Sequence, residues 1–185
     1  MYFCRRVLSI EVEYRAGATF LIFLERAIMQ RIKFSESILI GDSPETVFDF
    51  TQDYSKRLQW DTFLIQADLL DGAPHADKGV QAYCVSKNRL GMTTEYITFQ
   101  RPRGTAIKMT QGPYLFKEFL GSWRFRQVAD NSTEVTFLYS FTLRFPFMIA
   151  TYFIRKNLQQ NVRQRLVDLK TCIEYDRAQH TAEPA

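Results

Sequence analysis

The chain contains almost no histidine and little cysteine. Its two histidines, His75 and His180, lie in a turn-like stretch and in the C-terminal tail. The chain therefore has almost no histidine from which a catalytic triad or a histidine-ligated metal site could be built. The three cysteines, Cys4, Cys84 and Cys172, are widely spaced and form no C-x-x-C pair. This pattern disfavours a disulfide framework and a cysteine zinc site. We therefore expect no metal, no cofactor and a reducing, cytoplasmic location.

Strong charge of one sign and long hydrophobic runs are also missing. The net charge is +4 at pH 7, without any block of like charges, which argues against a nucleic-acid partner. The apolar stretch Ala16–Leu24 is too short to span a bilayer, which takes about 20 residues. It also makes a poor secretory signal, because Glu11 and Glu13 stand where basic residues are expected.

Residues 1–28 differ from the rest of the chain and leave two interpretations open. Met29 stands just before the first convincing strand, so the true start of the protein could be there. Alternatively, Thr19–Gln30 forms a short helix that packs on the domain or makes a transient contact with a membrane surface. The remainder predicts one domain over residues 29–178 and a disordered tail over 179–185.

Aromatic residues, by contrast, are abundant. They make up 15% of the chain and include 16 phenylalanines, within a hydrophobic content of 46% and a charged content of 24%. The overall balance is that of a globular protein. The phenylalanines fit either a densely aromatic core or the wall of an apolar cavity.

Alternation of apolar and polar residues predicts a series of strands, of which Ile32–Ile40 is the first. Asp42-Ser43-Pro44 then begins a helix, because either of its first two residues can cap it and proline suits the first turn. A second short helix is expected over Tyr54–Leu58. The strand predicted at Tyr114–Val128 is expected to bend near Gly121, because a glycine inside a strand often marks a bulge or a bend. The remaining strands are predicted at Ile65–Leu70, Gly79–Lys87, Met92–Gln100, Thr105–Gln111, Tyr114–Val128 and Thr133–Phe145.

A long amphipathic helix is predicted after Pro146. Extended to about Asp176, it would be roughly 45 Å long at 1.5 Å per residue. An antiparallel sheet of about seven strands must curl, and a helix with one apolar stripe must lie across its concave face. The sequence therefore predicts an α+β fold with two short helices after the first strand. The stripe consists of Thr151, Ile154, Leu158, Val162, Leu166, Leu169 and Ile173.

The first predicted helix contains Ser43–Phe48, Trp60 follows the second, and the last two strands contain Gly121–Phe125 and Thr133–Thr136. With these residues in this order of elements, the chain over about residues 30–174 resembles the SRPBCC superfamily, whose members share the START-like helix-grip fold. Within it, the chain is most similar to the polyketide cyclase/dehydrase-like group. The resemblance implies an apolar cavity between the sheet and the last helix. Superfamily members bind lipids, sterols, quinones, polyketides or plant hormones; some cyclise polyketides and others bind protein partners.

Two branches of the superfamily fit this chain less well. The ring-hydroxylating dioxygenase members need a mononuclear iron held by two histidines and a carboxylate, for which His75 and His180 are poorly placed. The quinone-chaperone branch is disfavoured because an obvious Pro-Trp-Cys signature is missing after the first helices.

A cyclase would need polar groups inside an apolar pocket, to enolise a ketone or to polarise a carbonyl. One catalytic candidate is Glu95, which would be a buried base if the face that it shares with Ile97 and Phe99 points inward. If Tyr96 faces inward instead, Glu95 is solvated. The best polar candidates are Tyr83, Glu95, Tyr96, Tyr139 and Asn161.

Tyr139 is the second catalytic candidate, since it lies on the inward face of the clearest strand. It equally fits a core tyrosine whose hydroxyl is satisfied by Tyr83 or by a helix side chain. The aromatic residues on the neighbouring strand would form either a stacking wall for a flat ligand or ordinary core. The ligand-binding residues that we expect are Tyr83, Tyr96, Phe119, Trp123, Phe125, Phe137, Tyr139, Phe141, Ile154, Leu158, Asn161 and Val162.

Three functions are compatible with these features. The first is the binding or carriage of an apolar small molecule such as a lipid, a quinone or a polyketide-like compound, and the scarcity of histidine and cysteine favours it. The second is a polyketide cyclase or dehydratase. The third is a protein-interaction module with a collapsed cavity.

The start of the last helix has a distinct composition. Phe147–Ile154, followed by Arg155-Lys156, could form an opening to the cavity or a membrane-surface contact.

Overall fold

The structure is a computed structural model that describes residues 31–182. The predicted extension over residues 1–28 and the last three residues of the predicted tail lie outside the described residues. The helices are α2 (Pro44–Gln52), α3 (Arg57–Trp60), the 3-10 turn η1 (Phe147–Ala150) and α4 (Thr151–Ala182). The strands are β1 (Ile32–Ile40), β2 (Leu64–Leu69), β3 (Gln81–Ser86), β4 (Gly91–Gln100), β5 (Gly104–Gln111), β6 (Phe116–Ala129) and β7 (Ser132–Leu143).

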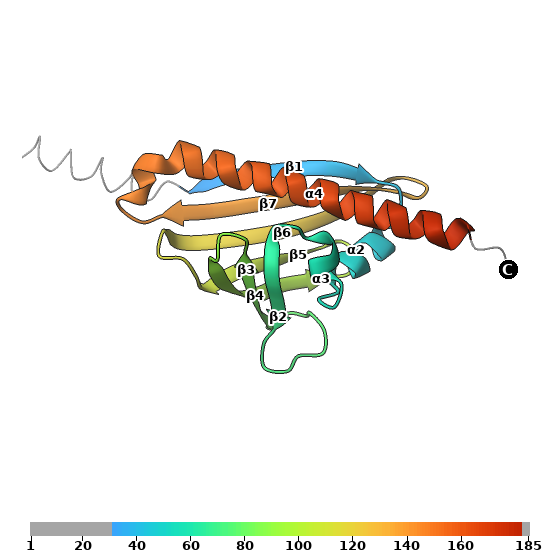
Figure 1. Ribbon diagram of the computed structural model, residues 1–185, viewed down its shortest axis with the longest axis horizontal. Helices are drawn as coiled ribbons and strands as arrows, with labels where there is room; N and C mark the ends of the chain where they lie inside the picture. The colour runs from blue at the N-terminus through green and yellow to red at the C-terminus, as the bar shows by residue number, and fades with distance from the viewer. Residues whose placement is uncertain (1–30, 183–185) are drawn as a thin grey trace, which may run out of the picture.

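All the strands form one antiparallel sheet of seven, in the order β1-β7-β6-β5-β4-β3-β2. After β1 the chain crosses to the far edge of the sheet, and each strand from β2 to β7 pairs with the next. β7 thereby reaches β1 and pairs with it, from Ile32 opposite Phe141 to Ile40 opposite Thr133. The sheet curls, and α4 runs along it beside β1 and β7, while β2, β3 and β4 form the far wall (Figure 1). The predicted helix-grip fold is confirmed.

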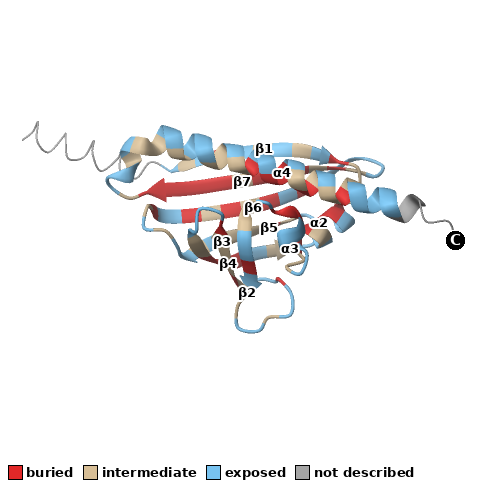
Figure 2. Cartoon of the chain, viewed as in Figure 1, coloured by how far each residue is buried: buried red, intermediate tan, exposed pale blue. Residues whose placement is uncertain are grey.

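The C-terminal helix starts and ends later than the sequence predicts. The chain first makes the turn η1, whose residues are not buried, and α4 continues to Ala182 instead of ending near Asp176. Its buried residues keep the predicted spacing and face the sheet, whereas its other sides are exposed (Figure 2). Polar contacts also hold α4 in place. Arg163 lies 2.9 Å from Glu36 on β1, and Thr62 donates to Asp168 over 2.5 Å.

The two short helices close one end of the curled sheet. α2 begins at Ser43, whose hydroxyl accepts a hydrogen bond from the Thr46 amide at 3.2 Å, with Pro44 in the first turn. This start was predicted correctly. α2 presents Phe48 to the sheet, where its ring centroid lies 5.3 Å from that of Phe125. The second helix, α3, is displaced from the predicted Tyr54–Leu58 and ends at Trp60, which is fully buried.

The helix start at Ser43 yields a stability prediction. Replacing Ser43→Ala removes the acceptor for the Thr46 amide, so the free energy of unfolding should fall by about 1 kcal/mol. Chemical denaturation with the denaturant slope held constant measures the difference. Ser35→Ala, on an exposed position of β1, is the matched control and should change stability by less than about 0.5 kcal/mol. Equal losses in the two variants would contradict the capping role.

Candidate ligand-binding site

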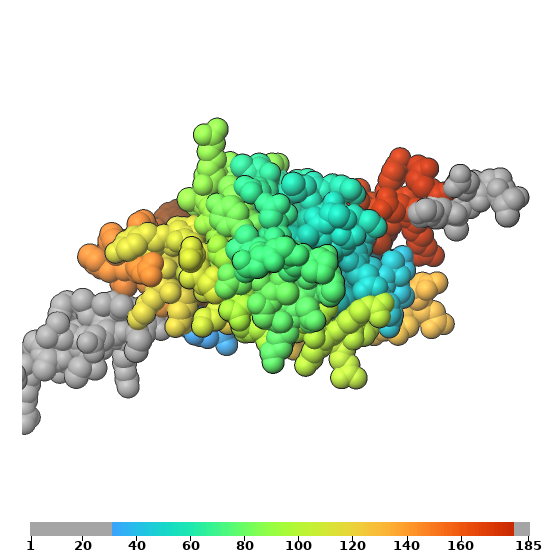
Figure 3. All heavy atoms as spheres, turned by 90° about the horizontal axis from the view of Figure 1, so that it is seen from below, coloured from blue at the N-terminus to red at the C-terminus, as the bar shows by residue number. Residues whose placement is uncertain are grey.

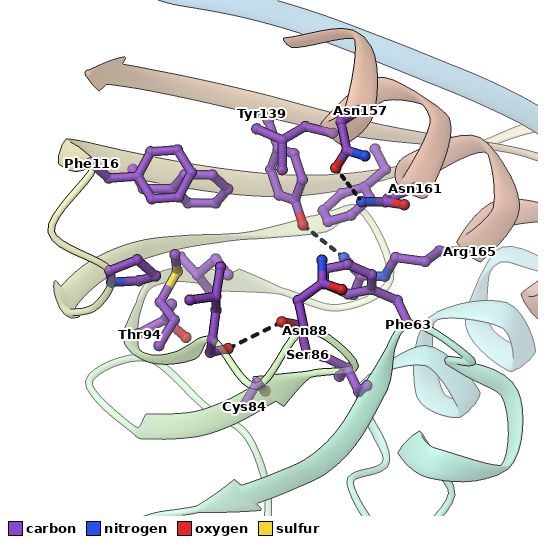
Figure 4. Close-up of a pocket in the computed structure, with 18 of the residues that line it drawn as sticks. Phe63, Cys84, Ser86, Asn88, Thr94, Phe116, Tyr139, Asn157, Asn161 and Arg165 are labelled. Carbon is purple, nitrogen blue, oxygen red and sulfur yellow. Dashed lines mark hydrogen bonds between the residues drawn. The ribbon is translucent and has the colours of Figure 1, made fainter. Parts of the chain in front are cut away.

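A cavity of about 650 Å³ lies between the concave face of the sheet and α4. This volume is within the range of about 300–1,000 Å³ typical of small-molecule sites. Its walls come from most of the fold: α3, the hairpin of β3 and β4, the inner faces of β5, β6 and β7, and the first half of α4. The side chains converge on one interior space (Figure 4). Those lining it are mainly apolar and aromatic, including Phe63, Leu64, Met92, Ile107, Leu115, Phe116, Phe119, Trp123, Phe137, Phe153, Ile154 and Leu158.

Aromatic rings on β6 and β7 make the inner wall. Trp123 and Phe137 are cross-strand partners, and their rings stack with centroids 4.0 Å apart and planes 7° apart. Tyr139 meets Phe119 and Phe137 edge-on, at centroid distances of 4.6 and 4.7 Å. Such pairs favour fixed ring orientations. The wall is therefore a rigid aromatic surface rather than a flexible aliphatic one.

A buried cluster of charges supplies the polar part of the cavity. Asp61, at the end of α3, is fully buried and receives hydrogen bonds from two guanidinium groups. Arg165 on α4 approaches it from one side, with its Nη2 2.6 Å from Asp61 Oδ2, and Arg57 from the other, with its Nε at 3.0 Å. Both arginines line the cavity. Two cations and one anion leave the cluster with a formal excess of one positive charge.

Aromatic and carbonyl groups complete the surroundings of the two arginines. The Arg165 guanidinium lies between the rings of Phe63 and Phe137, at 5.5 and 5.0 Å from their centroids. That of Arg57 lies 4.6 Å from the ring of Trp60, and its Nη1 donates to the Thr51 carbonyl. Ring faces attract cations, and the attraction strengthens where water is excluded. The excess positive charge is thus held in place by π-faces as well as by Asp61.

The cluster determines the protonation of its members. Burial alone would raise the pKa of Asp61, but the charges and hydrogen bonds of Arg165 and Arg57 outweigh it and hold that pKa below its usual value. Burial raises the pKa of the Tyr139 phenol, and the nearby Arg165 offsets only part of the effect. At neutral pH the site therefore holds an ionised carboxylate, two guanidinium ions and a neutral phenol.

Tyr139 connects the charge cluster to the cavity. Its hydroxyl oxygen accepts a hydrogen bond from Arg165 Nη1 at 2.7 Å (Figure 4). Within residues 31–182 its own O–H has no acceptor. Gly121 lies opposite on β6, and a methyl group there would be 3.3 Å from the Tyr139 ring and 3.2 Å from Ile107. The missing side chain leaves the space that the phenol ring occupies.

A second polar group lies at the α2 end of the cavity. The Tyr96 hydroxyl donates to Gln52 Oε1 at 3.0 Å and lies 3.3 Å from the hydroxyl of Tyr54. Burial raises the pKa of both phenols. Tyr54 and Tyr96 line the cavity, but each already has a protein partner. Their role in the fold is to join β4 to α2 and the segment after it.

The cavity reaches the surface between the β3–β4 hairpin and the first turns of α4. Asn88 and Leu90 on the hairpin are both exposed and cavity-lining, as are Phe153 and Asn157 on α4. Asn161 donates to Asn157 over 3.1 Å across one turn of the helix. The mouth thus combines amides with an aromatic ring, whereas Arg165 lies two helical turns further along α4.

Residues 31–174 match the family described as Polyketide cyclase / dehydrase and lipid transport. The chain belongs to this family. The resemblance recognised in the sequence is therefore confirmed, and the fold of this family implies binding of a hydrophobic ligand. A comparison with curated proteins gave no significant match.

Solved structures of family-like folds are similar over most of the chain. The Zhui aromatase/cyclase from Streptomyces sp. R1128 has a TM-score of 0.67 at 12% identity, over 78% of this chain and 94% of that one. A START superfamily protein from Mycobacterium smegmatis gives 0.61 at 12%, over 76% and 98%. Major latex-like protein 151 from Panax ginseng gives 0.61 at 11%, over 76% and 96%. At these identities the likeness shows the fold alone.

The structure of this family member brings most of the predicted ligand-binding residues to the cavity wall. They come from β4, β6, β7 and α4, which are distant in sequence, so the shared location follows from the curl of the sheet beneath the helix. The predicted residues that line the cavity are Tyr96, Phe119, Trp123, Phe137, Tyr139, Ile154, Leu158 and Asn161.

Four predicted residues lie elsewhere. Tyr83 is on the outer face of β3, since its neighbour Cys84 lines the cavity. Phe125 is beyond the cavity, covered by Phe48 of α2. Phe141 is fully buried among Phe34, Phe116 and Phe119. Val162 is also fully buried and belongs to the core cluster of the helix stripe.

The catalytic candidate Glu95 lies outside the cavity. Tyr96 lines it, and adjacent residues of a strand point to opposite faces. The expected link to Phe99 fails because the pairing of β4 with β5 shifts register between Tyr96 and Thr98. Past this bulge Phe99 returns to the side of Tyr96, with ring centroids 5.8 Å apart. The carboxylate of Glu95 is thus too badly placed to act as a base on a ligand.

The charge cluster was missed at the level of sequence. Arg165 falls within the apolar stripe of the last helix, between Val162 and Leu169 at helical spacing, and that position could have identified it as inward-facing. Arg57 and Asp61 are separated by four residues, a spacing that predicts a helical pair. The contact of this pair with Arg165 forms only in the tertiary fold, because Arg165 comes from a distant helix. Within the described residues no group of three metal-ligating side chains of the His, Cys, Asp or Glu type comes together.

The cluster predicts a large effect of neutralising its anion. Asp61→Asn leaves two buried guanidinium ions without their carboxylate, so the free energy of unfolding should fall by about 3–5 kcal/mol. The same change at Asp49, whose pair with Arg101 is exposed, is the matched control and should lower stability by no more than about 1 kcal/mol. Denaturant unfolding of both variants measures the contrast.

Acid should reduce the difference between Asp61→Asn and the unsubstituted chain. The pKa of Asp61 is lower in the folded than in the unfolded state. Its stabilising contribution is therefore complete above the unfolded value of about 3.9 and is lost as the pH falls through the folded value. A stability difference that stays constant down to acidic pH, or losses of equal size at Asp61 and Asp49, would contradict this account of the cluster.

Proposed function

We propose that this protein binds and carries an apolar small molecule that has one oxygen-bearing end. The observation that carries the proposal is the Tyr139 phenol, which accepts from Arg165 and has its own O–H unpaired within residues 31–182. Around this single polar point the wall is aromatic and aliphatic. Such a site suits a mostly hydrophobic ligand whose oxygen accepts a hydrogen bond from the phenol.

The charge of the cluster narrows the chemistry of that oxygen. Arg57 and Arg165 outnumber Asp61, so the wall behind Tyr139 carries positive charge. A carboxylate, an enolate or a polarised carbonyl would be favoured there over a basic group. Lipids, quinones and polyketide-like compounds all include members of this type. We also place the protein in the cytoplasm, which the scarcity of cysteine and the free thiols of Cys84 and Cys172 support.

A cyclase or dehydratase is the second candidate. A neutral phenol that is polarised by a guanidinium can donate a hydrogen bond or a proton to a carbonyl, and Tyr139 beside Arg165 has this arrangement. The lining of the cavity, however, contains no aspartate, glutamate or histidine that could serve as the matching base. Asp61 is engaged by two arginines. These facts support carriage over catalysis, and the cavity volume argues against an interaction module with a collapsed cavity.

Native mass spectrometry of the gently purified protein, followed by solvent extraction, tests the proposal directly. A co-purifying apolar compound with an acidic or carbonyl oxygen is the expected result. A clean unliganded mass, combined with no thermal shift from lipids, quinones or polyketide-like compounds, would overturn it. Turnover of a polyketide-like substrate that is lost in Tyr139→Phe would favour the cyclase instead.

The polar end of the ligand can be tested with a matched pair of tyrosines. With the fluorescent fatty acid cis-parinaric acid as probe, Tyr139→Phe should weaken binding by about tenfold, the effect of losing one hydrogen bond of about 1.4 kcal/mol. Tyr83→Phe is the same chemical change on the outer face of β3 and should leave the affinity unaltered. Titration by fluorescence measures both. Equal affinities in the two variants would show that the phenol does not contact the probe.

A further inference from the structure

Large apolar side chains are exposed together at one end of the molecule. They belong to the β5–β6 loop, the segment between β7 and η1, η1 itself and the first turn of α4. Several are mostly exposed, with Ile149 at 82%, Phe153 at 72% and Tyr114 at 70%. Exposed apolar clusters of this kind mark contact surfaces. We call this surface the apolar end, and define it by Tyr114, Phe145, Phe147, Ile149, Tyr152 and Phe153.

The apolar end is one continuous surface. The rings of Tyr114 and Phe147 have centroids 6.4 Å apart, and those of Tyr152 and Phe153 are 5.5 Å apart. Arg144 ties the β5–β6 loop to β7, since its Nη1 donates to the Tyr114 carbonyl at 2.8 Å. Figure 3 shows η1 and the start of α4, in orange, beside the yellow β5–β6 loop at one extremity of the described fold.

The surrounding charge is positive. No aspartate or glutamate occurs between Glu134 and Asp168 in the sequence. Within the described part of the chain, the exposed Arg155 and Lys156 have no carboxylate in ion-pair range. Glu118, on the adjoining start of β6, is neutralised by Arg31 at 2.6 Å. The apolar end therefore combines aromatic side chains with unneutralised cations, a composition that suits an anionic membrane surface.

The apolar end also borders the mouth of the cavity. Phe153 belongs to both, and Lys156 and Asn157 line the mouth one turn further along α4. No helix within residues 31–182 is long and apolar enough to cross a bilayer, so the side chains could enter only the interfacial layer. Tyrosine is well suited to that layer, because its ring is apolar and its hydroxyl stays in contact with water.

We propose that the apolar end docks the protein on anionic lipid membranes and brings the mouth of the cavity to the membrane surface. An apolar ligand would then pass between bilayer and cavity without crossing water. The docking rests on the exposed surface alone, whereas the transfer rests on the proposed function. The two are tested separately below.

The test is co-sedimentation of the full-length chain with vesicles of phosphatidylcholine, with and without phosphatidylserine. Binding should require the anionic lipid and weaken as salt is raised. The double variant Ile149→Ser/Tyr152→Ser should lower partitioning at least about tenfold, since two exposed apolar groups are lost. Arg155→Glu should lower it at least about fivefold. None of the three substituted residues lines the cavity itself, so affinity for cis-parinaric acid should be unchanged.

The matched control is Val167→Ser/Tyr175→Ser, which removes two exposed apolar side chains from the same helix but away from the apolar end. It should bind vesicles as the unsubstituted chain does, and circular dichroism should show all variants folded. The proposal is overturned if the unsubstituted chain does not bind anionic vesicles, if the control loses as much binding as Ile149→Ser/Tyr152→Ser, or if these residues instead drive self-association seen by analytical ultracentrifugation. Tyr139→Phe should leave vesicle binding intact, which separates failure of docking from failure of the proposed ligand contact.

Discussion

The ionised carboxylate of Asp61, buried between two arginines, is the constraint on which the site depends. It lies at the end of α3 and holds Arg165 of α4, which comes 104 residues later in the sequence, in the interior. Without it, neither guanidinium could remain in an apolar interior at acceptable free energy. Arg165 in turn orients the Tyr139 phenol. The position of the Tyr139 hydroxyl in the cavity therefore depends on Asp61, through Arg165.

The aromatic wall and the charge cluster support one another. Stacked rings of Trp123 and Phe137 give the guanidinium of Arg165 a π-face to rest against, and the cation limits how those rings can move. Gly121 leaves room for the phenol at the same level of the sheet. The register of β6 and β7 runs without interruption through this point, its irregularities being confined to the two ends of β6. The bend expected at Gly121 is thus not a break in pairing.

Much of the fold was predictable from sequence, and less of the site. The alternation in β7 and the stripe of α4 are signals of long, regular elements, and together they determine the sheet and its covering helix. The site depends on features that such periodicity does not contain. A bulge after Tyr96 reversed the expected relation of Glu95 to Phe99, and the placing of α2 over Phe125 removed that ring from the cavity. The contact of Arg165 with Asp61 joins segments that are far apart in the sequence, so periodicity alone does not predict it.

The depth of the Tyr139–Arg165 pair has a consequence for selectivity. The pair lies in the interior, and Arg165 is about three helical turns along α4 from the exposed Phe153 at the mouth. A ligand held there would enter oxygen first and leave its apolar remainder pointing outward. Recognition would then be strict for the leading group and lenient for the trailing one, so that homologous molecules of different chain length compete for one site. Such a protein would select its ligands by the oxygen-bearing group rather than by the length of the apolar part.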